Sequence, residues 1–122
     1  MDIKEPVILI RINRTYRENM SKGELYDATR GRWKIGRRRE KAEYAFAVYM
    51  GKIVEVYKIH EWIPANKAIF KTSIHSNSRV PEERWVFIGE VADDEIGNKY
   101  RNQSVKEYFS KGNQNPIRYI SC

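Results

Sequence analysis

The stretch Tyr44–Ile59, which reads YAFAVYMGKIVEVYKI, decides the fold. Its two arms, 44–49 and 53–59, are rich in β-branched and aromatic residues, and Met50-Gly51-Lys52 between them is a short turn that contains glycine. This arrangement is typical of a β-hairpin. In the second arm Ile53, Tyr57 and Ile59 fall on one face, so we expect at least one side of the sheet to be covered.

Further strands are expected on both sides of this hairpin. The run Val7–Ile12 is largely apolar at both alternating sets of positions and lies between Pro6 and Asn13, which is typical of a central strand. Near the end of the chain, residues 84–92 and 116–120 also read as strands.

A helix is expected between the first strand and the hairpin. Ser21 and Glu24 are spaced as a capping box, in which each side chain satisfies a free backbone donor of the first helical turn. Gly31 is suited to a helix end, so the pattern predicts a helix over 22–30.

A second capping box predicts another helix late in the chain. Ser104 and Glu107 have the same spacing, and Gly112 follows as the expected stop. We therefore place a short helix there, and we interpret Asp93-Asp94-Glu95 as an acidic turn.

The intervening residues 64–83 are polar and predict a long loop, broken by a short strand around 68–70. The order of elements is then strand, helix, hairpin, loop, strand, helix and strand. This order predicts a single α+β domain over residues 1–122. We expect a small, curved, mostly antiparallel sheet or a partly open β-barrel, with two or three short helices at its ends.

Composition and the length of the apolar runs indicate the class of protein and the cellular compartment to expect. Hydrophobic residues make up 41% of the 122 residues, which is typical of a globular chain. No apolar run approaches the roughly 20 residues that span a bilayer, and the first residues lack the features of a signal peptide, so we expect no membrane partner. Cys122 is the single cysteine, which excludes an internal disulfide and favours a reducing, cytoplasmic setting.

Charge is distributed unevenly along the chain. The net charge is +7, and residues 1–41 hold 12 Lys and Arg against 6 Asp and Glu, whereas residues 42–122 hold 11 against 10. Clustered positive charge attracts anions such as nucleic acid, nucleotides or an acidic protein. The alternative is a charge that serves solubility alone.

Most of this charge lies in residues 30–41, RGRWKIGRRREK, which we call the basic connector. Arginine forks match phosphate oxygens, and a tryptophan face can stack on a base. The connector predicts a set of phosphate-binding side chains: Arg30, Arg32, Lys34, Arg37, Arg38 and Arg39. Trp33 would stack on a base; the alternative is a solvated basic loop with Trp33 in the core.

Two other groups of residues fit nucleotide recognition. Trp62 and Trp85 flank strand ends and either line an aromatic pocket with Trp33 or pack in the core. Asn113, Gln114 and Asn115 carry amides that can read base edges, and a turn is an equally natural role for them.

The sequence contains little that predicts catalysis. Its two histidines, His60 and His75, lack neighbouring ligands in metal-binding spacing, so we expect neither a metal nor another cofactor. His75 lies among hydroxyl residues at 72–76, where a histidine could act on a phosphodiester.

These features together resemble the PUA-like superfamily of small barrels, which contains the ASCH, EVE and YTH domains. The resemblance rests on the basic, tryptophan-containing segment after the first helix, the hairpin arms 45–49 and 53–59, and the late strand 84–91. It implies a pocket with aromatic walls that binds RNA, modified DNA bases or nucleotides, with Trp33, Trp62 and Trp85 as the positions to test. Leu25–Lys34 together with 113–117 also resembles a domain of prokaryotic or phage proteins.

The leading hypothesis is a binding module for nucleic acid or a phosphorylated nucleotide. One alternative is an interaction or inhibitor protein that docks an acidic protein through its basic face. A third is a nucleotide hydrolase that uses His60 or His75.

Overall fold

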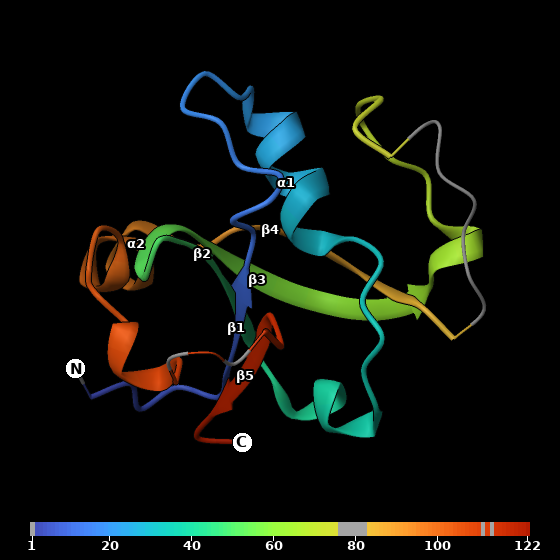
Figure 1. Ribbon diagram of the computed structural model, residues 1–122. Helices are drawn as coiled ribbons and strands as arrows, with labels where there is room; N and C mark the ends of the chain where they lie inside the picture. The colour runs from blue at the N-terminus through green and yellow to red at the C-terminus, as the bar shows by residue number, and fades with distance from the viewer. Residues whose placement is uncertain (1, 76–82, 111, 113) are drawn as a thin grey trace.

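The fold is built on one open sheet (Figure 1). The computed structural model describes residues 2–75, 83–110, 112 and 114–122. The strands are β1 (Val7–Arg11), β2 (Tyr44–Tyr49), β3 (Lys52–Pro64), β4 (Trp85–Val91) and β5 (Ile117–Ile120). Their order is β4-β3-β2-β1-β5; β1 and β2 are parallel, and the other neighbours are antiparallel. The α+β class and the mostly antiparallel sheet are confirmed, and in the described residues the sheet does not close into a barrel.

Strand β1 is central, as predicted. It lies between β2 and β5, and its apolar side chains alternate between two faces that are both buried. Ile8 and Ile10 belong to the core under α1 (Lys22–Arg30), whereas Val7 and Leu9 belong to the core under α2 (Asp94–Tyr100). The sheet is therefore covered on both faces, which explains why this strand lacks an apolar–polar alternation.

Helix α1 and the hairpin also match their predictions. The Ser21 hydroxyl accepts from the Glu24 backbone at 3.1 Å, and the Glu24 carboxylate accepts from the Ser21 backbone at 3.0 Å. In the hairpin turn Met50 and Gly51 have φ of 51° and 77°, the left-handed pair that suits the twist of the two strands. Strand β3 continues past the expected end at Ile59, and a register shift there accompanies its visible bend (Figure 1).

The second helix lies earlier than the sequence pattern predicts. Asp93 begins α2 by accepting from the Ile96 backbone at 3.1 Å, so the expected acidic turn is a helix N-terminus. The Ser104 capping box gives only a short 3₁₀ helix, η3 (Lys106–Tyr108). The cause is tertiary, because the Val105 backbone donates to Gly51 at 2.7 Å and is held against the hairpin. Among the described residues, neither helix is long and apolar enough to cross a bilayer.

The segment after β3 forms a 3₁₀ helix, η2 (Ala65–Lys67), and then a loop. The short strand expected at 68–70 is absent from the described structure, because this loop packs against α1 instead of pairing with a strand. Residues 76–82 of the predicted long loop lie outside the described residues.

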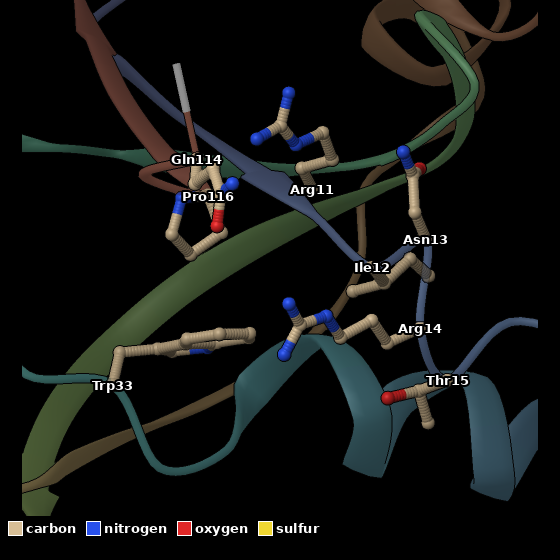
Figure 2. Close-up of a pocket in the computed structure, with 8 residues that line it drawn as sticks. All are labelled: Arg11, Ile12, Asn13, Arg14, Thr15, Trp33, Gln114 and Pro116. Atoms are coloured by element: carbon tan, nitrogen blue, oxygen red, sulfur yellow. The ribbon is translucent and has the colours of Figure 1, made fainter. Parts of the chain in front are cut away.

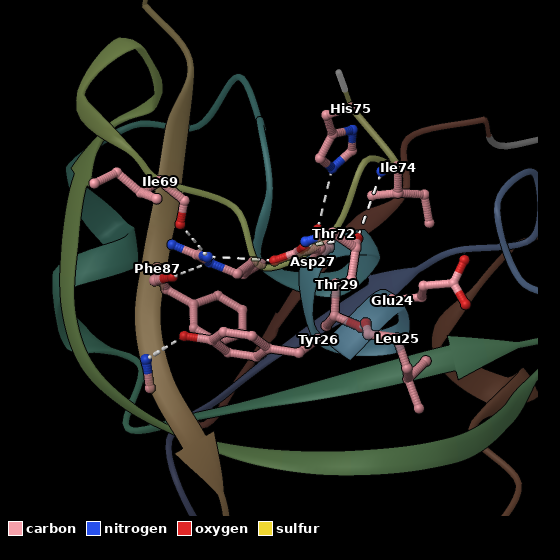
Figure 3. A network of polar contacts seen from close by, with 12 residues as sticks. Glu24, Leu25, Tyr26, Asp27, Thr29, Ile69, Thr72, Ile74, His75 and Phe87 are labelled. Atoms are coloured by element: carbon pink, nitrogen blue, oxygen red, sulfur yellow. Dashed lines mark hydrogen bonds and ion pairs between the residues drawn. The ribbon is translucent and has the colours of Figure 1, made fainter. Parts of the chain in front are cut away.

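A buried ion pair fastens that loop to α1 (Figure 3). Asp27 and Arg30 are 0% and 2% exposed, with 3.3 Å between the carboxylate and the guanidinium. Arg30 also donates to the carbonyls of Phe87 and Ile69, each at 3.1 Å, and Asp27 accepts from the Thr72 backbone at 2.7 Å and hydroxyl at 2.8 Å. Arg30 is therefore an internal residue, and its predicted role in phosphate binding is wrong.

Candidate functional site

A pocket of about 590 Å³ opens where β1 ends, a volume in the range of small-ligand sites. We call it the Trp33 pocket, and its lining residues are Arg11, Ile12, Asn13, Arg14, Thr15, Trp33, Gln114 and Pro116. Figure 2 shows the indole of Trp33 across from Gln114 and Pro116, with the guanidinium of Arg14 directed toward the same space. Three distant segments of the chain thus meet at one end of the sheet.

The turn after β1 forms one wall. The Ile12 carbonyl accepts from the backbones of Thr15 at 3.1 Å and Tyr16 at 2.9 Å, which reverses the chain directly after the strand. The Asn13 side chain accepts from the Met50 backbone at 2.9 Å and ties this turn to the hairpin. The arginines on either side of Asn13 are thereby held on a fixed support.

The opposite wall is a tryptophan whose ring is held in place. Trp33 and Trp85 exchange both backbone hydrogen bonds at 2.9 Å, which adds the connector to the edge of β4. The Trp33 indole nitrogen donates to the Thr29 carbonyl at 2.8 Å, near the end of α1. Its ring is half-buried, so one part packs on the core and another lines the pocket. A fixed aromatic face loses little entropy when a flat ligand stacks on it.

The positive charge of Arg14 is not balanced within the described structure. Arg14 is exposed and forms no hydrogen bond or ion pair within the described structure. The described residues that line the pocket include no acidic side chain. Arg11 stands beside it, with its guanidinium over the Phe109 ring at 5.1 Å from the centroid. An anion that enters the pocket therefore meets two guanidinium groups and an aromatic face.

The basic connector contributes less to this site than its sequence predicts. Besides Arg30, Arg39 is buried at 8% exposure, with its guanidinium 3.6 Å from the centre of the Trp85 ring. Its Nε lies 3.2 Å from a carboxylate oxygen of Glu40. The expected phosphate contact by Arg39 is therefore corrected to a packing role against tryptophan.

The other connector cations lie outside the Trp33 pocket. Arg32 is half-buried at a backbone φ of 66°, and Lys34 lines a separate hollow beside Trp85. Arg38 donates to the backbone oxygen of Cys122 at 2.8 and 3.0 Å. Arg37 is exposed and has no partner within the described structure. Whether these four contact a phosphate stays a prediction.

The three tryptophans do not form one aromatic pocket. Trp62 is 8% exposed and packs edge-on against Phe87, with ring centroids 5.5 Å apart, so its predicted stacking role is corrected to a core role. Trp85 is half-buried under Arg39 and borders the hollow of Lys34. Trp33 is the tryptophan that shares a pocket with Arg14.

The amide residues predicted at positions 113–115 do not all lie in the Trp33 pocket. Gln114 lines the Trp33 pocket, whereas the Asn115 side chain accepts from the Ile117 backbone at 3.0 Å and shapes the entry to β5. Asn113 lies outside the described residues.

The histidines lie elsewhere. His60 contacts Glu90 at 3.1 Å on the exposed side of β3. His75 packs against Phe70 and contacts the Asp27 carbonyl at 3.1 Å, and its burial lowers the pKa of its imidazole. Neither is among the described residues that line the Trp33 pocket.

No protein-family model, curated protein or solved structure matches this chain.

Sequence reasoning named Trp33 and Gln114 but missed Arg11, Asn13 and Arg14. A signal was present, because the carboxyl end of a strand that leads to a helix is a common place for ligand contacts. Arg11 and Arg14 lie within two residues of Asn13 at that position. Because the basic connector has a higher density of charge, the phosphate-binding residues were predicted there and not at Arg11 and Arg14.

Proposed function

We propose that this protein binds nucleic acid or a phosphorylated nucleotide in the Trp33 pocket. A base stacks on Trp33, and phosphate oxygens contact the guanidinium groups of Arg14 and Arg11. The observation that carries the proposal is the unbalanced charge of Arg14 beside a fixed, accessible aromatic face. Gln114 lies across the pocket from Trp33, and its side-chain amide can pair with a base edge.

The chemistry of the pocket favours a nucleotide over an acidic protein. A carboxylate-rich protein surface would bind to exposed cations, and it would not require a concave site with an aromatic wall. A nucleotide has a flat base joined to a compact anion, which matches the pairing of indole and guanidinium. This function agrees with that implied by the PUA-like resemblance, and we retain both that kinship and a cytoplasmic setting as parts of the proposal.

The test is a titration of intrinsic tryptophan fluorescence with mononucleotides and short oligonucleotides at two salt concentrations. Trp62 is buried and Trp85 lies outside the Trp33 pocket, so a quench at saturation is expected to come mainly from Trp33. Trp33→Leu keeps apolar packing but removes the stacking face, and we expect it to weaken binding by roughly 1–3 kcal/mol. Because this variant also lacks the reporting indole, its affinity is measured by isothermal titration calorimetry.

A matched pair of arginine variants separates the pocket from net charge. Arg14→Gln removes a charge inside the pocket, and we expect about tenfold weaker binding because a charged hydrogen bond contributes roughly 1.5 kcal/mol or more. Arg17→Gln removes the same charge three positions along, where Arg17 pairs with Glu24 at 2.9 Å outside the pocket. Equal losses in both variants, or no saturable response to any nucleotide by the folded protein, overturn the proposal and favour an acidic protein partner.

A further inference from the structure

A second pocket of about 590 Å³ adjoins the Trp33 pocket. We call it the Met50 pocket; its lining residues are Arg11, Asn13, Met50, Gly51, Lys106, Phe109, Ser110 and Gly112. Arg11 and Asn13 line both pockets, so the two are neighbours that meet at the end of β1.

The Met50 pocket has the same kind of chemistry as the first. Lys106 is exposed beside the hairpin turn, and Phe109 supplies an aromatic ring. Met50 is 64% exposed in the turn of the hairpin, so its apolar side chain is accessible to a ligand in this pocket. As in the Trp33 pocket, no acidic side chain is among its described lining residues.

Arg11 lies where the Trp33 pocket and the Met50 pocket meet. Its guanidinium lies 5.1 Å from the Phe109 ring centroid, and that of Arg118 lies 5.2 Å from the same centroid. A phosphate that linked a base on Trp33 to a nucleotide over Met50 would pass this arginine. The cations Arg14, Arg11 and Lys106 would then follow the backbone of one ligand, with apolar or aromatic groups beside its bases.

We propose that the ligand is a single strand of at least two nucleotides, which continues from the Trp33 pocket past Arg11 into the Met50 pocket. This inference rests on the proposed function and specifies its ligand. A base must be unstacked to lie on Trp33, so duplex nucleic acid does not fit this arrangement.

The experiment measures affinities of uridine and thymidine mononucleotides and of oligouridylates and oligothymidylates of two to six nucleotides. Pyrimidine strands stack weakly on themselves, and comparison of the ribo and deoxy series shows whether the sugar is read. We expect binding at least about tenfold tighter for the trinucleotide than for the mononucleotide, with a steeper salt dependence.

Variants locate that gain. Lys106→Gln should remove most of the trinucleotide advantage and leave mononucleotide affinity unchanged. Met50→Glu, which puts a negative charge at an exposed turn position, should do the same. The matched control is Lys67→Gln, because Lys67 is an exposed lysine on η2, outside both pockets, and its loss should change neither affinity.

The outcomes separate the two proposals. Mononucleotide and trinucleotide binding of equal strength, or a trinucleotide advantage that survives both Met50-pocket variants, overturns the strand inference while the Trp33 pocket stands. Binding of no nucleotide or oligonucleotide overturns the proposed function and the inference together.

Discussion

Two regions of this protein that are rich in arginine differ in how far their side chains are available to a ligand. The basic connector has six basic residues between positions 30 and 39, of which Arg30 and Arg39 are buried. The last residue of β1 and the turn that follows contribute two arginines, Arg11 and Arg14, and both line the Trp33 pocket. Charge density along a sequence therefore does not predict which charges a ligand can reach. Availability is decided by which side chains the core takes up to satisfy its own polar groups.

The largest effect that this contrast predicts is for Arg30→Met. The substitution keeps an unbranched apolar stem but leaves Asp27 as an uncompensated buried carboxylate, which typically costs about 3–5 kcal/mol. Urea unfolding measures the loss, and the fraction of soluble protein reports it if the variant does not fold.

The control for Arg30 is the double variant Asp27→Asn with Arg30→Met. It removes the charge from both partners, so we expect it to regain part of the lost stability. A loss of unfolding free energy below about 1 kcal/mol in the single variant would mean that Arg30 is exposed. Its predicted role in phosphate binding would then stand again.

The next effect is for Arg39→Met, which removes the guanidinium from the Trp85 ring. Cation–π contacts of desolvated groups contribute roughly 2 kcal/mol, so we expect a loss of about 1–2 kcal/mol in unfolding free energy. Nucleotide affinity should stay unchanged because Arg39 is outside the Trp33 pocket. The reverse result, weaker binding with unchanged stability, would make Arg39 a ligand contact.

What the sequence predicted well is local. The hairpin 44–59, the strand at β1 and the cap at Ser21 each depend on residues within one element, and periodicity and capping chemistry report these directly. The Ser104 cap failed because its neighbour Val105 is held by the hairpin turn, a contact that no local pattern contains.

The candidate site was predictable only in pieces. Trp33 and Gln114 were recognised by residue type, but their meeting depends on β1 lying between β2 and β5. The same long-range packing separated Trp62 from Trp33 and drew Arg30 toward carbonyls of Phe87 and Ile69. Composition suggested the residue types of a binding site, and topology decides which of those residues line the Trp33 pocket.

A smaller effect should appear as a pH dependence in the loop that Arg30 holds. Burial lowers the pKa of His75 below its ordinary value near 6.5, so the folded protein binds this proton less readily than the unfolded chain. Stability is thus full above about pH 6.5 and falls as the pH drops from there toward the lowered folded pKa.

Urea midpoints at pH 7.5 and 5.5 measure this dependence for the native protein and for His75→Gln. Glutamine retains a polar group near the Asp27 carbonyl but does not titrate, so the difference between the two pH values should shrink. An unchanged difference would mean that other groups carry the dependence and that His75 is solvated.

The smallest effect is expected for Arg37→Gln, and it is the sharpest test of the contrast. Arg37 belongs to the dense connector, is exposed and has no partner in the described residues, whereas Arg14 belongs to the sparse turn. Both substitutions remove one charge from the surface, so long-range attraction changes equally in the two variants.

If the pocket governs binding, Arg37→Gln changes the free energy of unfolding by less than about 0.5 kcal/mol and the affinity by less than about twofold. In the same assay Arg14→Gln weakens binding about tenfold. If Arg37→Gln weakens binding as much as Arg14→Gln at high salt, where only direct contacts persist, then the connector touches the ligand and the binding surface extends from the Trp33 pocket across η1 (Arg37–Lys41).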